Sequence, residues 1–248
     1  MNIDIFITSA SRPKHLKKVL ESLNIYLHIN EHNIRWVIVE DVCNGKLSGD
    51  VIRLTKYFDK RYIVMPSKGM INSIKTYLEQ AFSDYTLKLV DDMILYRHID
   101  LDYYIGIMEK YKNINQLIFN KRVSKNSQIH KDLKVTMDME MVPCKKFSSM
   151  NSIWRTMFVK ELWPKIMNEG DRNIHNISTN LYTYFKKKEI GRKDFVSKLG
   201  SYYPGSGEGE YCFFKHIGTN ISRMWPHKNK EIYRKDGCGY NEMECKEG

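Results

Sequence analysis

The sequence predicts an α/β protein with a mostly parallel sheet and helices on both faces, and three observations carry that prediction. Apolar and amphipathic stretches alternate along the first 105 residues, as in a parallel sheet with right-handed crossovers. The apolar stretches are short, which suits buried strands. Polar or charged residues follow three of these stretches, and in open α/β folds ligands bind where the strands end.

The elements of the first half follow from the spacing of its apolar residues. A strand is expected over residues 2–8, and Pro13 then suits the start of a helix. Leucine and valine recur at helical spacing in the segment that follows, which predicts a helix over residues 15–27. The further elements expected here are strands at 35–40, 62–65 and 85–90 and helices at 51–58 and 70–82.

The second half is less regular, and we expect it to belong to the same single domain. Residues 1–105 would form one half of that domain and residues 106–248 the other. Proline and glycines in residues 201–210 predict a mobile loop. The other elements expected here are strands at 117–122, 134–142 and 211–217 and helices at 152–167 and 176–188.

Composition excludes several classes of protein. With 42% hydrophobic and 28% charged residues, the chain is expected to be globular, and no apolar run is long enough to predict a membrane span. The first residues lack the features of a secretory signal. The five cysteines are scattered without a CxxC pair, which disfavours a disulfide framework or a zinc site. We therefore expect a cytoplasmic protein, in the host cytoplasm if it is viral.

The net charge of +11 is concentrated in the second half of the chain. Residues 1–105 carry a balance of +1, and residues 106–248 carry +10. This asymmetry predicts a surface that meets an anionic partner, such as nucleic acid, a phosphorylated glycan or an acidic membrane. The alternative is a lysine-rich composition that serves solubility.

Two adjacent carboxylates, Asp91 and Asp92, follow the strand expected at 85–90. Ionised carboxylates are not buried in a core unless they are paired or bound to metal, so we expect Asp91 and Asp92 at the carboxyl edge of the sheet. Two acids there suggest a divalent cation and a phosphorylated ligand, and the alternative is a solvated turn. Parallel strands would bring four further polar residues to the same edge: Ser9, Ser11, Glu40 and Asp41.

Four segments of the chain resemble a nucleotide-sugar glycosyltransferase of the GT-A fold, close to the family 2 type. They resemble its first strand and loop, its second strand, the helix and strand that deliver the Asp-x-Asp motif, and the late His-x-Gly segment. These segments are residues 5–13, 37–41, 68–92 and 215–222. The first three, together with the helix that follows the first and ends at residues 21–23, are distributed over residues 3–95, and residues 96–210 match loosely.

The resemblance implies a donor, most simply a UDP-sugar, and a Mn²⁺ or Mg²⁺ ion. It assigns the ion to Asp92 and His216, and the ribose or a second metal contact to Asp91. The motif departs from Asp-x-Asp, which would need an acid at Val90 or Met93. The residues expected to bind the nucleotide-sugar are Thr8, Ser9, Ser11, Arg12, Glu40, Asp41, Lys68, Gly69, Asn72 and Asp91.

The resemblance also implies acceptor residues and, for transfer with inversion, a general base. The segment that resembles the base site offers Asp171, with Glu169 as the second choice. An enzyme that retains configuration requires no such base. The residues expected to bind the acceptor are Trp154, Arg155, Lys186 and Lys187, although tryptophan at such a position is more often part of the core.

The basic second half favours DNA as the acceptor. Basic groups contact phosphates, aromatic rings stack on bases, and a base modified within a duplex must be flipped out. Enzymes of this kind are the bacteriophage glycosyltransferases that modify hydroxymethylated pyrimidines such as hydroxymethylcytosine, and the resemblance to glycosyltransferases is compatible with that class. The first alternative is synthesis of surface polysaccharide or lipopolysaccharide. A nucleotidyltransferase is disfavoured because residues 9–14 lack glycine, and a non-catalytic nucleic-acid-binding protein would not explain the acids.

Overall fold

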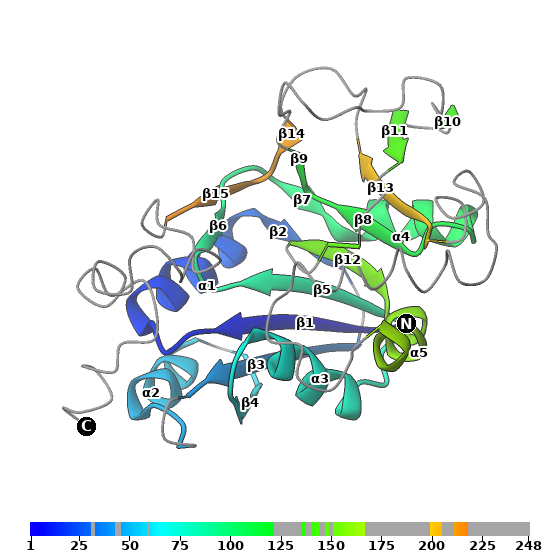
Figure 1. The fold of residues 1–248 in the computed structure, drawn as a ribbon. Helices are drawn as coiled ribbons and strands as arrows, with labels where there is room; N and C mark the ends of the chain where they lie inside the picture. The colour runs from blue at the N-terminus through cyan, green and yellow to red at the C-terminus, as the bar shows by residue number, and fades with distance from the viewer. Residues whose placement is uncertain are drawn as a thin grey trace, which may run out of the picture.

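The described part of the chain folds into a mixed nine-stranded sheet with helices on both faces (Figure 1). The computed structural model describes residues 1–30, 33–42, 46–58, 60–121, 135–136, 140–143, 147–148, 151–166, 199–204 and 211–217. None of the helices within these residues is both long and apolar enough to cross a membrane.

Four neighbouring strands form the parallel half of the sheet, in the spatial order β4-β3-β1-β5. They are β1 (Asn2–Ser9), β3 (Asn33–Asp41), β4 (Tyr62–Ser67) and β5 (Tyr85–Val90). The helices between them are α1 (Pro13–Tyr26), α2 (Gly49–Tyr57) and α3 (Met70–Gln80). Every strand and helix predicted for residues 2–90 is therefore confirmed, with ends that differ by a few residues.

The starts of these helices have local causes. Pro13 occupies the first turn of α1, where its missing N–H costs no hydrogen bond. The Ser48 hydroxyl accepts a hydrogen bond of 3.2 Å from the Asp50 N–H and so caps α2. Gly69 precedes α3 with a φ of 85°, a conformation that side chains other than glycine disfavour. These starts place the loops that follow β1, β3 and β4.

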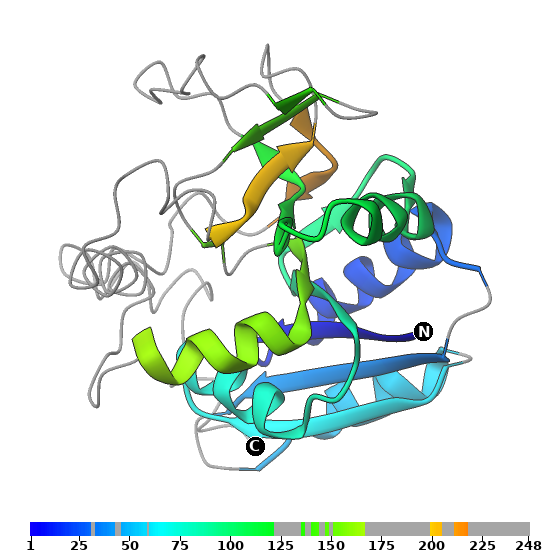
Figure 2. The same cartoon turned by 90° about the vertical axis from the view of Figure 1, so that its right-hand side faces the viewer.

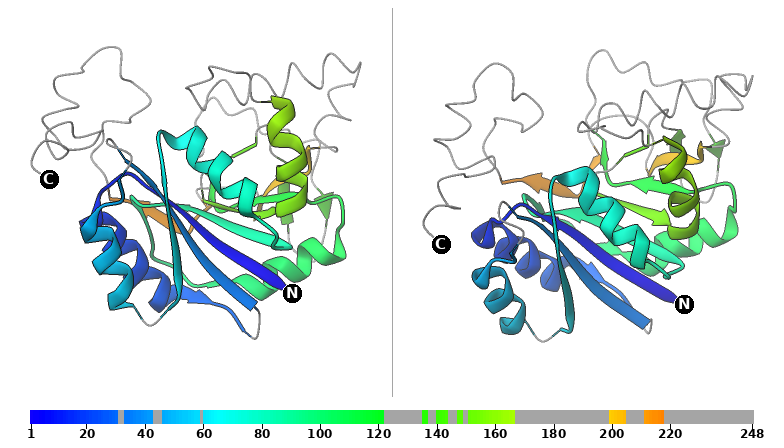
Figure 3. Two further views of the ribbon diagram at one scale, coloured as in Figure 1. Left: turned by 90° about the horizontal axis from the view of Figure 1, so that it is seen from below. Right: turned by 60° about the horizontal axis from the view of Figure 1, so that its bottom comes forward.

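The sheet separates two cores, and the helices divide between them (Figure 3). Alternate residues of β1 point to opposite faces, so Ile5 packs in the core that α1 contributes to and Phe6 in the core that α3 contributes to. Helix α4 (Leu101–Lys110) joins the first core and α5 (Thr156–Ile166) the second. Helices on both faces of the sheet were predicted, and they are confirmed.

The rest of the sheet is largely antiparallel and continues from β5 in the order β12-β8-β13-β11-β10. In Figure 2 the parallel strands lie at the bottom and β13, in yellow, near the top. Its strands are β8 (Gln116–Ile118), β10 (Val135–Thr136), β11 (Glu140–Pro143), β12 (Ser152–Arg155) and β13 (Ser201–Pro204). The pair β13 and β8 is parallel.

Three short strand pairs flank the main sheet. They join β2 (Leu27–His28) to β7 (Ile99–Asp100), β9 (Asn120–Lys121) to β14 (Tyr211–Cys212), and β6 (Met93–Leu95) to β15 (Phe214–His216). The last pair joins a late segment of the chain to the residues directly after Asp92. The strand predicted over 211–217 is thus confirmed as two short pieces.

Two predictions for the second half are wrong in part. Residues 152–155 form β12 and not the first turn of a helix, because pairing with both β5 and β8 outweighs their helical spacing. Residues 201–204 form β13 and not a loop, for the same reason. The strand predicted over 117–122 is divided between β8 and β9, and residues 134–142 contribute to β10 and β11. The helix predicted over 176–188 lies outside the described residues.

Candidate active site at the carboxyl edge of the sheet

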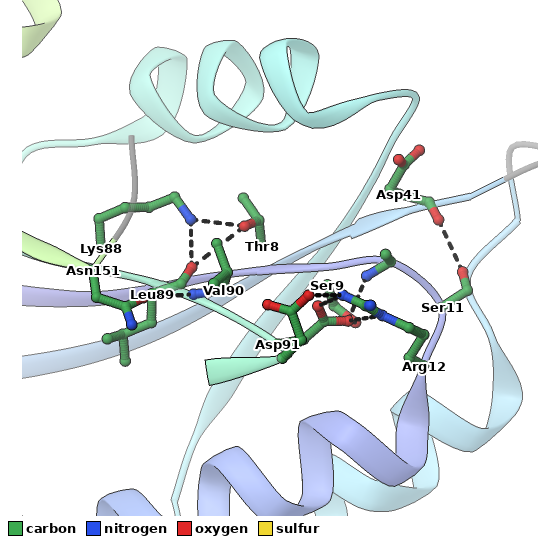
Figure 4. Close-up of polar contacts among 12 residues, drawn as sticks. Thr8, Ser9, Ser11, Arg12, Asp41, Lys88, Leu89, Val90, Asp91 and Asn151 are labelled. Carbon is green, nitrogen blue, oxygen red and sulfur yellow. Dashed lines mark hydrogen bonds and ion pairs between the residues drawn. The ribbon is translucent and has the colours of Figure 1, made fainter. Parts of the chain in front are cut away.

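Three parallel strands end side by side, and each end carries polar residues. Within the sheet, Ser9 of β1 is in register with Glu40 of β3, and Thr8 is in register with Val90 of β5. Asp91 follows Val90 directly, and its N–H donates a hydrogen bond of 3.1 Å to the Thr8 carbonyl oxygen. The predicted convergence of the strand-end residues is therefore present, and Figure 4 shows the contacts of Asp91 with Ser9 and Arg12.

Asp91 is the centre of this cluster. Its side chain is 2% exposed, and its Oδ2 atom accepts hydrogen bonds from the Ala10 N–H at 2.8 Å and the Ser9 hydroxyl at 3.3 Å. The Arg12 Nε–H donates to the same oxygen at 3.3 Å, and Arg12 Nη2 donates to Asp91 Oδ1. The end of β1 and the loop after it thus surround the Asp91 carboxylate with the Ser9 hydroxyl, the Ala10 N–H and the Arg12 guanidinium (Figure 4).

Arg12 also reaches the second acid. Its Nη2 atom lies 3.1 Å from Asp92 Oδ2, and the side chains of Arg12 and Asp92 are 10% and 19% exposed. Burial works to lower the pKa of Arg12, but Asp91 and then Asp92 outweigh it, so the pKa is raised and the guanidinium stays charged. The edge therefore holds one buried cation between two carboxylates.

Glu40 and Asp41 fix the neighbouring loops. Glu40 is fully buried, and it accepts hydrogen bonds from the Ser11 hydroxyl at 3.2 Å and the Ser48 N–H at 2.9 Å. Its pKa is raised, chiefly by burial, and the two hydrogen bonds only partly oppose this. The Asp41 Oδ1 atom accepts from the Gly69 N–H at 2.6 Å. These acids therefore connect the β1 loop to the starts of α2 and α3.

The turn between β4 and α3 completes the rim, by which we mean the loops that follow β1, β3, β4 and β5 at the carboxyl edge of the sheet. The Asn72 side-chain amide donates a hydrogen bond of 2.7 Å to the Lys68 carbonyl oxygen, and both side chains are exposed. Because Gly69 bonds to Asp41, the structure brings Lys68, Gly69 and Asn72 to the same edge as Asp91. Their predicted contact with a nucleotide-sugar stays a prediction, as it does for the other residues of this rim.

Sequence reasoning assigned no role to Lys88, which lies behind the acid pair on β5. Its ammonium donates a hydrogen bond of 2.7 Å to the Thr8 hydroxyl and a second one to the Leu89 carbonyl oxygen. The residue is fully buried, and burial lowers its pKa to about 7 although Asp91 and Asp92 work in the opposite direction. A lysine inside an otherwise apolar strand was the available signal, and it was treated as part of the strand.

The strand β15 brings the chain around His216 to the acids. His216 is in antiparallel register with Met93, and the Ile217 N–H donates a hydrogen bond of 2.8 Å to the Asp92 carbonyl oxygen. The backbone of the predicted His-x-Gly segment therefore begins beside Asp92. Whether His216 contacts a metal or a pyrophosphate stays a prediction.

The predicted acceptor residues Trp154 and Arg155 lie away from this edge. Trp154 is fully buried and packs its ring against Phe6. Arg155 is in register with Tyr85, the first residue of β5, so it lies at the opposite edge of the sheet from Asp91. This placement gives no support to an acceptor role for either residue, and it arises because β12 runs antiparallel to β5. The remaining predicted residues lie outside the described part of the chain: Glu169, Asp171, Lys186 and Lys187.

The predicted divalent cation does not fit the acid pair as it is arranged. Within the described residues, no group of three or more histidine, cysteine, aspartate or glutamate side chains could hold a metal ion. Both oxygens of Asp91 accept hydrogen bonds, and Asp92 Oδ2 faces the Arg12 guanidinium. The positions where an Asp-x-Asp motif would have its other acid are Val90 and Met93, and both are buried. A cation placed on these carboxylates would stand against the positive charge of Arg12.

Comparison with known proteins finds likeness in structure and not in sequence. The sequence matches no protein-family model and no curated protein. Among solved structures, residues 1–349 of Staphylococcus aureus TarS in complex with UDP match with a TM-score of 0.56 and 11% identity, over 86% of this chain and 60% of that one. This chain therefore spans about 60% of the length of that TarS fragment.

Two further structures show the same likeness. A mannosyltransferase from Pyrobaculum calidifontis in complex with GDP-Man and Mn²⁺ has a TM-score of 0.53 and 10% identity, over 73% of this chain and 51% of that one. GalNAc-T7 with UDP, GalNAc and Mn²⁺ has a TM-score of 0.54 and 14% identity, over 73% of this chain and 40% of that one. At these identities the likeness concerns the fold, and the predicted GT-A fold is confirmed.

Proposed function

We propose that this chain is a glycosyltransferase that binds a nucleotide-sugar, most simply a UDP-sugar, at the carboxyl edge of β1, β3 and β5. The observation that carries the proposal is the buried cluster of Asp91, Asp92 and Arg12 where these parallel strands end. Ligands of open α/β sheets bind at this edge, and a guanidinium there suits a phosphate group. The likeness of the fold to that of a mannosyltransferase in complex with GDP-Man supports the proposal of a nucleotide-sugar donor.

The proposed reaction breaks the bond between the anomeric carbon of the sugar and a phosphate oxygen. The nucleoside diphosphate leaves with that electron pair, and the acceptor hydroxyl oxygen forms the new bond to the sugar. A preorganised cation beside the departing diphosphate stabilises the charge that develops in the transition state. Arg12 is the described residue placed for this, and Asp171 or Glu169 is the proposed base that takes the acceptor proton if configuration inverts.

The nucleotide is proposed to lie along the rim that follows β1 and β3. Glu40 and Asp41 would bind its base or ribose. The ribose contact that the resemblance assigns to Asp91 stays a prediction, because both oxygens of Asp91 accept hydrogen bonds from this chain. The divalent cation that the resemblance assigns to Asp92 and His216 remains a prediction outside this proposal, and no step of the transfer depends on it.

The acceptor that we propose is a hydroxymethylated pyrimidine in DNA. The support is the charge of the chain, because residues 106–248 carry a balance of +10 while residues 1–105 carry +1. Basic surfaces bind the DNA backbone through its phosphates. Hydroxymethylcytosine supplies the hydroxyl that a glycosyltransferase requires.

The test offers UDP-, GDP- and CMP-sugars to the purified protein, with and without duplex DNA that contains hydroxymethylcytosine. Mass spectrometry of the nucleosides then detects the product. We expect a gain of one sugar mass on hydroxymethylcytosine, lost in Asp91→Asn and kept in the matched control Asp102→Asn, whose carboxylate bonds to the Asn30 N–H. Donor hydrolysis without a DNA product would move the acceptor to a glycan. Failure to turn over any donor would contradict the proposed function.

A further inference from the structure

Arg12 lies between the two adjacent acids at the carboxyl edge of the sheet. The guanidinium contacts both oxygens of Asp91 and one oxygen of Asp92, and only 10% of the Arg12 side chain is exposed. Asp91 is 2% exposed, so this is a buried cluster and not a surface ion pair. Its geometry is fixed by several hydrogen bonds, which distinguishes it from an incidental contact.

The surrounding charge shows why a cation is needed at this edge. Glu40, Asp41, Asp91 and Asp92 all follow or end the parallel strands, and three of them are at least nine-tenths buried. A diphosphate that arrives here adds further negative charge. Within the described residues, Arg12 is the cation in direct contact with the acid pair, since Lys88 donates to Thr8 and Leu89 instead.

Arg12 also keeps hydrogen-bonding capacity for a ligand. Its Nε and Nη2 groups bond to the two aspartates, and no described residue accepts a hydrogen bond from its Nη1 group. A guanidinium carries five N–H donors in a planar fork, and it can bind a carboxylate and a phosphate at once. The contacts to the two aspartates therefore leave the Nη1 group of Arg12 for an anionic oxygen of a ligand.

We infer that Arg12 is the resident cation of this site, so that the diphosphate of the donor binds without a divalent metal ion. A metal ion and the guanidinium would compete for Asp92 Oδ2, and the guanidinium is built into the chain. Asp91 and Asp92 then hold Arg12 in place for the diphosphate, in contrast to the metal ligation that the resemblance implies. This inference rests on the proposed function for the identity of its ligand.

The test measures binding of the metal ion and binding of the nucleotide independently of each other. Electron paramagnetic resonance of free Mn²⁺ measures metal binding without any nucleotide, and calorimetry measures UDP binding in EDTA and in Mn²⁺. The variants are Arg12→Gln, which removes the cation, and Arg12→Lys, which keeps it. Arg53→Gln is the matched control, because Arg53 is exposed on α2 and pairs with Asp50. Circular dichroism confirms that each variant is folded.

We expect wild-type protein to bind UDP equally well in EDTA and in Mn²⁺, and to bind Mn²⁺ at least tenfold more weakly than Arg12→Gln does. Arg12→Gln should lose about tenfold or more of its UDP affinity in EDTA, as for a charge-assisted hydrogen bond, and Arg12→Lys should recover part of it. Equal Mn²⁺ affinity in wild type and Arg12→Gln would overturn the inference, as would UDP binding by wild type that requires Mn²⁺. If UDP fails to bind under every condition, the proposed function fails, and the Mn²⁺ comparison still decides whether Arg12 excludes the metal.

Discussion

Lys88→Met removes a fully buried ammonium group that lies directly behind the acid pair. The pKa of Lys88 is lowered from 10.5 to about 7, first because burial penalises the charged form. Between these pH values the unfolded chain holds a proton that the folded chain has released, so stability rises with pH. One such proton contributes up to about 1.4 kcal/mol per pH unit, and the rise from pH 7 to pH 9 amounts to about 2 kcal/mol.

The assay is urea unfolding of wild type and Lys88→Met at pH 7, 8 and 9, followed by tryptophan fluorescence. The free energy of unfolding of wild type should gain about 2 kcal/mol relative to the variant over this range, because methionine cannot titrate. Lys75→Met is the matched control, since Lys75 is 66% exposed on α3, and its difference from wild type should stay constant. A difference between wild type and Lys88→Met that does not change with pH would refute the reasoning.

Three further substitutions test how the edge is held together. Gly69→Ala forces a side chain into a φ of 85° and should cost about 1 kcal/mol, seen as a lower midpoint of thermal unfolding; an unchanged midpoint would contradict the strain. Arg35→Gln leaves the buried Asp4 carboxylate without its ion pair and should cost about 3 kcal/mol in urea unfolding, while UDP affinity measured by calorimetry stays the same because this pair lies at the amino edge of the sheet. Ser11→Ala removes a hydrogen bond to Glu40 and should lower the free energy of unfolding by about 1 kcal/mol and weaken UDP binding, and full UDP affinity would show that the β1 loop does not position the nucleotide.

The parallel half of the fold could be predicted because its signals are local. Apolar stretches alternate with amphipathic ones, and the polar residues after each strand converge once the strands are parallel. Ser9, Glu40 and Asp91 were placed together on that argument alone, and the structure brings them together.

The antiparallel half could not be predicted in the same way, because pairing partners there are distant in sequence. Ser152–Arg155 is a strand because β5 and β8 lie on either side of it, and the identity of these pairing partners cannot be predicted from the four residues themselves. Strand direction also decides which edge a residue reaches. The predicted acceptor residue Arg155 lies beside Tyr85, at the far edge, since β12 runs opposite to β5.

The side-chain contacts within the site could not be predicted from the sequence either. Arg12 follows the first strand in a loop, where an arginine is usually solvated, and its burial between two acids depends on the backbone course after Ser9. Lys88 was hidden by the opposite effect, since a single polar residue in an apolar strand is normally placed at the surface. Arg12 was predicted at this edge from the sequence, but its contacts with both acids, like the buried position of Lys88, required the three-dimensional structure.

The most direct test of the central claim is amide hydrogen exchange with and without saturating UDP, read by mass spectrometry. The account predicts slower exchange in peptides that cover residues 8–12, 40–41 and 88–92, where the three parallel strands end, and no change at the opposite edge around Arg35 and Tyr85. Slower exchange confined to other parts of the chain, or none at a UDP concentration that calorimetry shows to be saturating, would contradict the claim that this edge binds the donor.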